Sequence, residues 1–166
     1  EAWRLALLNN AGPTALVLSR QNLSGLNRDI FAAAEGVRRG GYILKDAVSG
    51  TPDVILIATG SEIETALKAA DILEKNGTQV RVVSLPCWEV FDQQEEAYRR
   101  KVLPPEIKAR VAIEAGIKLG WEHYTGTTGK IVGMESFGAS APAPVLFEKF
   151  GITADAVVAA AKTFLP

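Results

Sequence analysis

The segment that most constrains the fold is Asp53-Val-Ile-Leu-Ile-Ala-Thr59, in which every residue between the two polar ends is apolar. A strand with one face in water alternates apolar and polar residues. A strand of a parallel sheet is instead covered by helices on both faces and reads as a continuous apolar run. The segment therefore predicts a buried strand of a parallel sheet, with helices on both of its sides.

A helix and a second strand are predicted directly after this segment. Apolar residues recur at helical spacing at Ile63, Leu67, Ala70 and Leu73. Ser61 and Glu64 predict a capping box at the start of this helix, and Asn76-Gly77 predicts its end. Because Gln79–Ser84 is again a strand pattern, strand, helix and strand form a right-handed parallel crossover.

The same alternation continues to the C-terminus and predicts a three-layer α/β sandwich. Further strands are predicted at Tyr42–Asp46, Arg110–Ala115 and Lys130–Gly133. Helical segments are predicted at 86–101 and 142–150, and from the N-cap Thr153 onward. Periodicity alone defines neither the strand order nor the direction of the edge strand at Tyr42–Asp46.

The first forty residues predict a different organisation. Glu1–Asn10 reads as the end of a helix, and Thr14–Leu18 is a wholly apolar run that predicts a buried strand. From Asn22 to Gly41 the apolar periodicity fades and glycines accumulate, which predicts a linker with one short helical turn. Because the chain starts inside a helix and without methionine, we expect it to be part of a longer protein.

Composition excludes several classes of function. The 166 residues are 48% hydrophobic, enough for an ordinary core, and the net charge of -1 has no basic stripe for nucleic acid. Cys87 is the only cysteine, which excludes an intrachain disulfide and fits a reducing compartment such as the cytosol or a plastid interior. No apolar run reaches the roughly 20 residues that span a bilayer, so no membrane partner is expected.

Two positions are candidates for binding an anion. Arg20 follows an apolar strand pattern, at the place where open α/β folds bind ligands, and its planar guanidinium suits a phosphate; the alternative is an ordinary salt bridge. Gly60-Ser61-Glu62 joins a strand to a helix and could hold an anion with its backbone amides, although simple capping of the helix is favoured.

Four other features have weaker functional interpretations. His123 and Cys87 are expected to be structural, because neither has a partner nearby in sequence. Glu114 would need a partner from another domain or subunit to act as a site carboxylate. The run Glu135–Pro144 is either a loop at the mouth of a site or, as the favoured interpretation, a tight turn between layers.

Several segments, in their order, together resemble transketolases. The segments that carry the resemblance are Gly12-Pro-Thr-Ala-Leu-Val-Leu-Ser-Arg-Gln-Asn22, Gly40-Gly-Tyr-Ile-Leu-Lys-Asp46, Ile57-Ala-Thr-Gly-Ser-Glu62, Val80-Arg-Val-Val-Ser84 and Phe137-Gly-Ala-Ser-Ala-Pro142. The joint occurrence of L-S-R-Q-N, A-T-G-S-E and F-G-A-S-A-P is far more specific than any one of them.

The resemblance implies a mixed, mostly parallel five-stranded sheet with one antiparallel strand. It implies that residues 1–21 are the tail of a pyrimidine-binding domain, 22–39 a linker and 40–166 the C-terminal domain. The family transfers a two-carbon ketol unit between sugar phosphates, as a homodimer, with thiamine diphosphate and Mg or Ca bound by upstream sequence. By motif, Arg20 corresponds to the arginine that holds the substrate phosphate; no catalytic, cofactor or metal residue is expected within this chain.

Two alternatives to transketolase remain. The chain could belong to a related thiamine enzyme, such as dihydroxyacetone synthase, deoxyxylulose-phosphate synthase or the β subunit of a 2-oxo acid dehydrogenase, although L-S-R-Q favours transketolase. The other alternative is a non-catalytic interaction module; within a transketolase, too, we expect this fragment by itself to serve dimerisation and structural support and to be inactive.

Overall fold

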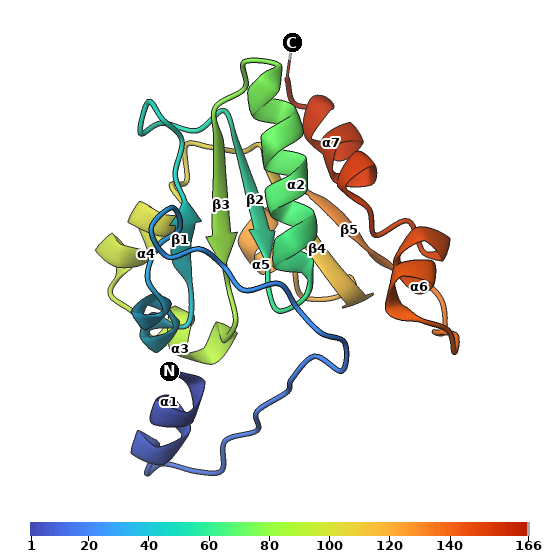
Figure 1. Cartoon of the computed structure of the whole chain (residues 1–166). Helices are drawn as coiled ribbons and strands as arrows, with labels where there is room; N and C mark the ends of the chain where they lie inside the picture. The colour runs from blue at the N-terminus through green and yellow to red at the C-terminus, as the bar shows by residue number, and fades with distance from the viewer. Residues whose placement is uncertain (166) are drawn as a thin grey trace.

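The computed structural model describes residues 1–165 and contains one mixed sheet of five strands (Figure 1). In sheet order the strands are β1 (Tyr42–Lys45), β3 (Val80–Ser84), β2 (Val54–Ala58), β4 (Arg110–Ile117) and β5 (Lys130–Met134). β1 is an edge strand that pairs antiparallel with β3, and the other neighbours pair in parallel. The mixed, mostly parallel five-stranded sheet is therefore confirmed.

The central strand β2 is the apolar segment that the sequence placed inside the sheet. All five of its residues have zero exposed surface. It pairs with β3 on one side and with β4 on the other, and each of its faces packs on a separate hydrophobic core. An uninterrupted apolar run is what this position requires.

The first core lies between the sheet and α2 (Glu62–Lys75) and α7 (Ala154–Lys162), with α6 (Ala143–Lys149) beside them (Figure 1). Side chains from alternate positions of β2 and the apolar stripe of α2, including Ala66, Ala70 and Leu73, make up this core. Thr153 caps α7 as predicted, because its Oγ1 accepts a hydrogen bond of 3.2 Å from the backbone N–H of Ala156.

The second core lies on the opposite face of the sheet, under α3 (Trp88–Asp92), α4 (Glu96–Val102) and α5 (Glu122–Thr125). Phe91, Trp121 and Tyr124 are its large buried aromatic residues. The predicted helical turns at 86–101 correspond to α3 and α4, whereas the single turn α5 was not predicted. Helices on both faces make the three-layer α/β/α sandwich.

The N-terminal segment departs from the sequence prediction. The helix α1 (Ala2–Leu8) is present, but 14–18 is not a strand: Val17 and Leu18 are 94% and 77% exposed, with no strand of residues 1–165 beside them. The prediction was wrong because an apolar run becomes a strand only where neighbouring strands complete its hydrogen bonds.

The predicted linker contains a 3-10 helix, η1 (Ala34–Arg39), which corresponds to the expected short helical turn. Leu26, Phe31 and Val37 are partly buried against the first core, and the N–H of Ala32 donates to the carbonyl of Leu44 in β1. This part of the chain is therefore packed on the sandwich rather than hanging free of it.

Candidate functional site

The connections of the sheet place a crevice between the carboxyl ends of β2 and β4. β2 continues into α2, which covers the first core, whereas β4 continues into α5, which covers the second core. Adjacent strands whose connections leave for opposite faces form a topological switch point, where open α/β sheets bind ligands. In Figure 1 the N-terminal segment passes across this edge of the sheet on its way to β1.

The carboxyl group of Glu62 lies at this crevice and is buried, with only 4% of the residue exposed. It accepts a hydrogen bond from Ser61 Oγ (2.8 Å), and the backbone N–H groups of Glu62 and Ala115 lie near enough to favour its charged form. Burial raises the pKa of Glu62 above its ordinary value, and the Ser61 hydrogen bond and the two amides partly offset that effect. A carboxylate of the chain itself thus occupies the start of α2.

This arrangement changes two interpretations of the Gly60–Glu62 turn. The capping box of Ser61 and Glu64 is wrong, because the Ser61 side chain makes no cap hydrogen bond and donates to Glu62 instead. Glu64 forms an ion pair with Lys68 one turn along α2. An external anion at the turn gains no support, because the Glu62 carboxylate already lies beside the local amides.

Glu114, near the end of β4, is the second carboxyl group at the crevice. It is half-buried, and the nearby Trp121 side chain favours its charged form. Burial is the main cause that raises the pKa of Glu114, and the negative charge of Glu62 raises it further. The structure therefore supplies the acidic neighbour that Glu114 lacked in sequence, and this neighbour comes from the same chain.

A groove continues from the crevice along the first face. It consists of two adjoining hollows of about 270 Å³ and 440 Å³, both bordered by Gln21, Ser61 and Phe147. Asn22 borders the larger hollow, and Gly138 the smaller. The L-S-R-Q-N, A-T-G-S-E and F-G-A-S-A-P segments, far apart in sequence, therefore meet at one place.

Arg20 lies on the exposed stretch of chain beside this groove. It makes no hydrogen bond or ion pair with the rest of residues 1–165, so its guanidinium can bind a group from outside the chain. Residues 135–141 are likewise all exposed and form an open loop after β5, so the tight turn between layers is wrong. The sequence could not distinguish the two because small residues and prolines suit both.

His123 and Cys87 lie at the margin of the second core. His123 is exposed, and its Nε2 is 3.4 Å from Asp92 Oδ1. Cys87 is half-buried beside Glu89, and burial is the main cause that raises the pKa of its thiol. A thiol with a raised pKa forms little of the reactive thiolate, in agreement with a structural role.

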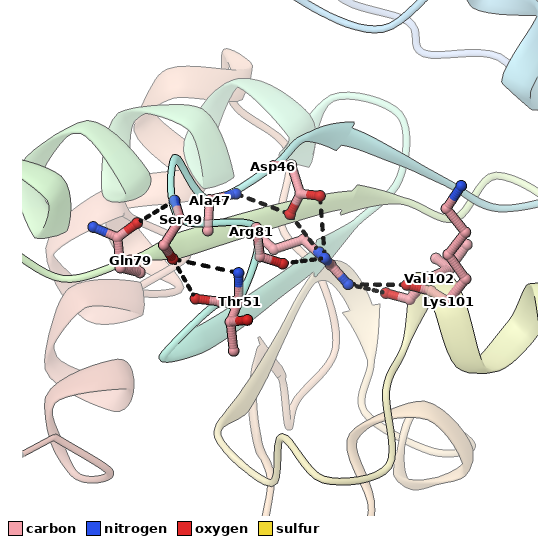
Figure 2. Close-up of polar contacts among 9 residues, drawn as sticks. Asp46, Ala47, Ser49, Thr51, Gln79, Arg81, Lys101 and Val102 are labelled. Atoms are coloured by element: carbon pink, nitrogen blue, oxygen red, sulfur yellow. Dashed lines mark hydrogen bonds and ion pairs between the residues drawn. The ribbon is translucent and has the colours of Figure 1, made fainter.

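A polar cluster around Arg81 lies at the opposite, amino edge of the sheet (Figure 2). Its side chain is 6% exposed and binds both carboxylate oxygens of Asp46, at 2.7 and 3.1 Å. It also donates to the backbone carbonyls of Lys101 (2.9 Å), Val102 (3.4 Å) and Gly50 (3.3 Å). Every direction of the guanidinium is used within the chain, so this cluster is structural.

The sequence matches a known family over most of its length. The sequence model described as "Transketolase-like TK C-terminal domain" matches residues 40–153. The chain belongs to this family. Transketolase of Aquifex aeolicus is 48% identical over 94% of the chain, and the chloroplastic transketolase-1 of Arabidopsis thaliana is 51% identical over 98%. The chain spans 22% of the length of each of these relatives.

Solved structures give the same assignment. The transketolase from Leishmania mexicana superposes with a TM-score of 0.87 at 43% identity, over 99% of this chain and 24% of that one. The Pichia stipitis transketolase in complex with sedoheptulose-7-phosphate superposes with a TM-score of 0.74 at 37% identity, over 87% of this chain and 20% of that one. The transketolase family and its C-terminal fold are therefore shown.

Within residues 1–165, no three His, Cys, Asp or Glu side chains lie close enough to hold a metal ion. The same residues contain no helix long and apolar enough to cross a membrane.

Proposed function

We propose that this chain acts as the C-terminal region of a transketolase, which transfers a two-carbon ketol unit from a ketose phosphate to an aldose phosphate. The observation that carries the proposal is the 48% and 51% identity, over nearly the whole chain, to relatives named transketolase. The meeting of three family-specific segments at one groove supports it. A bacterial and a chloroplastic relative fit a role in the pentose phosphate pathway or the Calvin cycle, in the cytoplasm or a plastid.

The chain divides, in this proposal, into the tail of a pyrimidine-binding domain (1–21), a linker (22–39) and the C-terminal domain (40–166). The family model begins at residue 40, and Trp3, Leu7 and Val17 are 69%, 78% and 94% exposed. Exposed apolar side chains in such a concentration require a covering surface. Upstream domains of the enzyme and a second subunit of a homodimer are the partners we propose.

The cofactors of the reaction are thiamine diphosphate and Mg or Ca. Residues 1–165 offer no cluster of metal ligands, so their side chains do not fit the metal-diphosphate group. We place the cofactor site in the upstream domains and assign no step of its chemistry to this chain. The contribution of this chain is to bind and orient substrate.

Arg20 is the residue to which we assign the substrate phosphate. Its guanidinium is exposed and unpaired within residues 1–165, beside the groove where the family segments meet. A planar guanidinium can donate two parallel hydrogen bonds to phosphate oxygens, which fixes the position of the sugar as well as its charge. The Pichia stipitis transketolase was solved with sedoheptulose-7-phosphate, a ligand of this class.

Kinetics of the full-length transketolase that contains this region test the proposal. Arg20→Ala should raise KM for ketose and aldose phosphates by roughly 10- to 100-fold, the value of a charge-assisted contact. An unphosphorylated ketol donor should be used equally well by both proteins. Arg20→Lys, which retains the charge but loses the planar fork, should be intermediate, and the 166-residue chain alone should be inactive. Equal KM values for parent and Arg20→Ala would remove Arg20 from the site.

A further inference from the structure

We propose that the carboxyl ends of β4 and β5 form a docking surface on which the pyrimidine-binding domain of the same enzyme chain packs. The docking surface consists of residues 117–119, at the end of β4, and residues 134–138, at the end of β5. The inference rests on the proposed function, because it takes residues 1–21 as the tail of the pyrimidine-binding domain. It goes beyond that function by stating where on the sandwich this domain packs.

The two segments of the docking surface are held side by side. Ile117 pairs with Met134 in the sheet, and Lys118 forms an ion pair with Glu135, one residue further along each segment. The loops that follow β4 and β5 therefore begin at the same point. Because the two charges are already paired with each other, a partner that covers this point leaves no unpaired charge behind.

The docking surface carries exposed apolar side chains. Ile117, Leu119 and Phe137 are 71%, 77% and 99% exposed. In the rest of residues 40–165 the exposed large apolar side chains are Val48, in the loop after β1, and Val145, on α6. Single exposed apolar side chains are ordinary, whereas several at one place indicate a surface that a partner covers.

The path of the N-terminal segment identifies the partner. Val17 and Leu18, in the tail of the pyrimidine-binding domain, are 94% and 77% exposed. Gln21 then borders the smaller hollow of the groove together with Gly138 of the docking surface, and in Figure 1 the segment passes across the carboxyl edge of the sheet. A domain that buries Val17 and Leu18 is therefore tethered at this edge, whereas no covalent connection brings a second subunit to it.

Photo-crosslinking of the full-length enzyme tests which surface covers Phe137. Benzoylphenylalanine in place of Phe137 should form a cross-link to a peptide of the pyrimidine-binding domain within the same chain, identified by mass spectrometry. The matched control is the same probe in place of Val48, which is 97% exposed at the amino edge, where the N–H of Ser49 donates to Gln79; it should give no such cross-link. A covalent dimer on a denaturing gel, which would assign the surface to a second subunit, or no cross-link from position 137, would overturn the inference.

Trypsin digestion of the same enzyme tests whether packing of the two domains depends on Phe137. Phe137→Asp should speed cleavage after Arg20 on the order of tenfold, because an aromatic side chain buried at an interface contributes about that factor and cleavage follows the population of the open form. Phe137→Leu should stay within about threefold of the parent, and Val48→Asp should not change the rate. Equal rates for Phe137→Asp and Val48→Asp would contradict the docking surface.

Transketolase kinetics of the same preparations separate this inference from the proposed function. An inactive parent enzyme, or an unchanged KM in Arg20→Ala, would count against the proposed function. Normal kinetics together with equal behaviour of positions 137 and 48 would overturn the docking surface alone.

Discussion

Replacement of Arg81 by methionine should destabilise the chain more than any exposed charge substitution. The methionine side chain fills much of the same space but cannot donate to Asp46 or to the carbonyls of Gly50, Lys101 and Val102, which Figure 2 shows converging on the guanidinium. The substitution therefore separates the end of β1, the loop after it and the end of α4 from β3.

The loss of stability depends on which hydrogen-bond partners of Arg81 can be hydrated once the guanidinium is removed. Breaking a buried ion pair by removing one partner costs about 3–5 kcal/mol. The Asp46 side chain is 42% exposed and can be hydrated when its partner is lost, which favours the lower end of this range. The carbonyl of Val102 belongs to a residue that is 1% exposed, and it would remain without a partner. We therefore expect a loss of about 3 kcal/mol, a large share of the 5–15 kcal/mol of a typical domain.

Urea unfolding of the 166-residue chain, followed by tryptophan fluorescence and far-UV circular dichroism, measures this loss. The midpoint should fall while the slope m stays constant. Arg100→Met is the control, because the guanidinium of Arg100 is 54% exposed and pairs with Glu96 at 3.4 Å; its loss should cost under about 1 kcal/mol. A loss below about 1 kcal/mol for Arg81→Met as well would refute the claim that the buried cluster stabilises the fold.

Two further predictions concern single positions. Gly40→Ala should abolish or severely weaken folding, because Gly40 has a φ of 75° and an added Cβ would lie 2.3 Å from the backbone nitrogen of Phe91. Gly50 is the control, since it has a similar φ of 78° but open space around it. Gly50→Ala should therefore lower the free energy of unfolding in urea by only about 1 kcal/mol. Since the pKa of Glu114 is raised in the folded state, its effect on stability is favourable at low pH and is lost as pH rises through that pKa. Glu114→Gln should remove this part of the pH dependence, which lies above the ordinary value of 4.5, whereas an unchanged pH profile of urea unfolding would contradict the shift.

Most of the sandwich could be predicted from the sequence because its strands and helices pack against one another within the chain. The continuous apolar run at 53–59 became β2, and the helical spacing after it became α2, since each finds its partners within the chain. The run at 14–18 has the same apolar character but was wrongly predicted as a strand, because residues 1–165 offer it no neighbouring strand. An apolar pattern indicates that a segment tends to be buried. Whether it is buried as a strand depends on a neighbouring strand that can pair with it.

The candidate site was less accessible to sequence reasoning. Arg20 was identified from its place after an apolar run and from its motif, but Glu62 was read only as part of a capped turn. Its burial beside Ala115, 53 residues further along the chain, depends on the pairing of β2 with β4. Contacts of this kind leave no local pattern in the sequence, because hydrophobic periodicity does not predict the strand order that creates them.

The arginines at the two edges of the sheet have different roles: those at the amino edge stabilise the fold, and the one at the carboxyl edge is proposed to bind substrate. At the amino edge, Arg81 and Arg110 both turn toward the second core, and Arg110 donates to the carbonyls of Leu103, Pro104, Ile107 and Tyr124. At the carboxyl edge, the Glu62 carboxyl group accepts a hydrogen bond from Ser61, and Arg20 stays unpaired among residues 1–165. Since an arginine whose donors are all used inside the chain cannot bind substrate, Arg20, and neither Arg81 nor Arg110, is the one whose substitution should change KM without changing the free energy of unfolding.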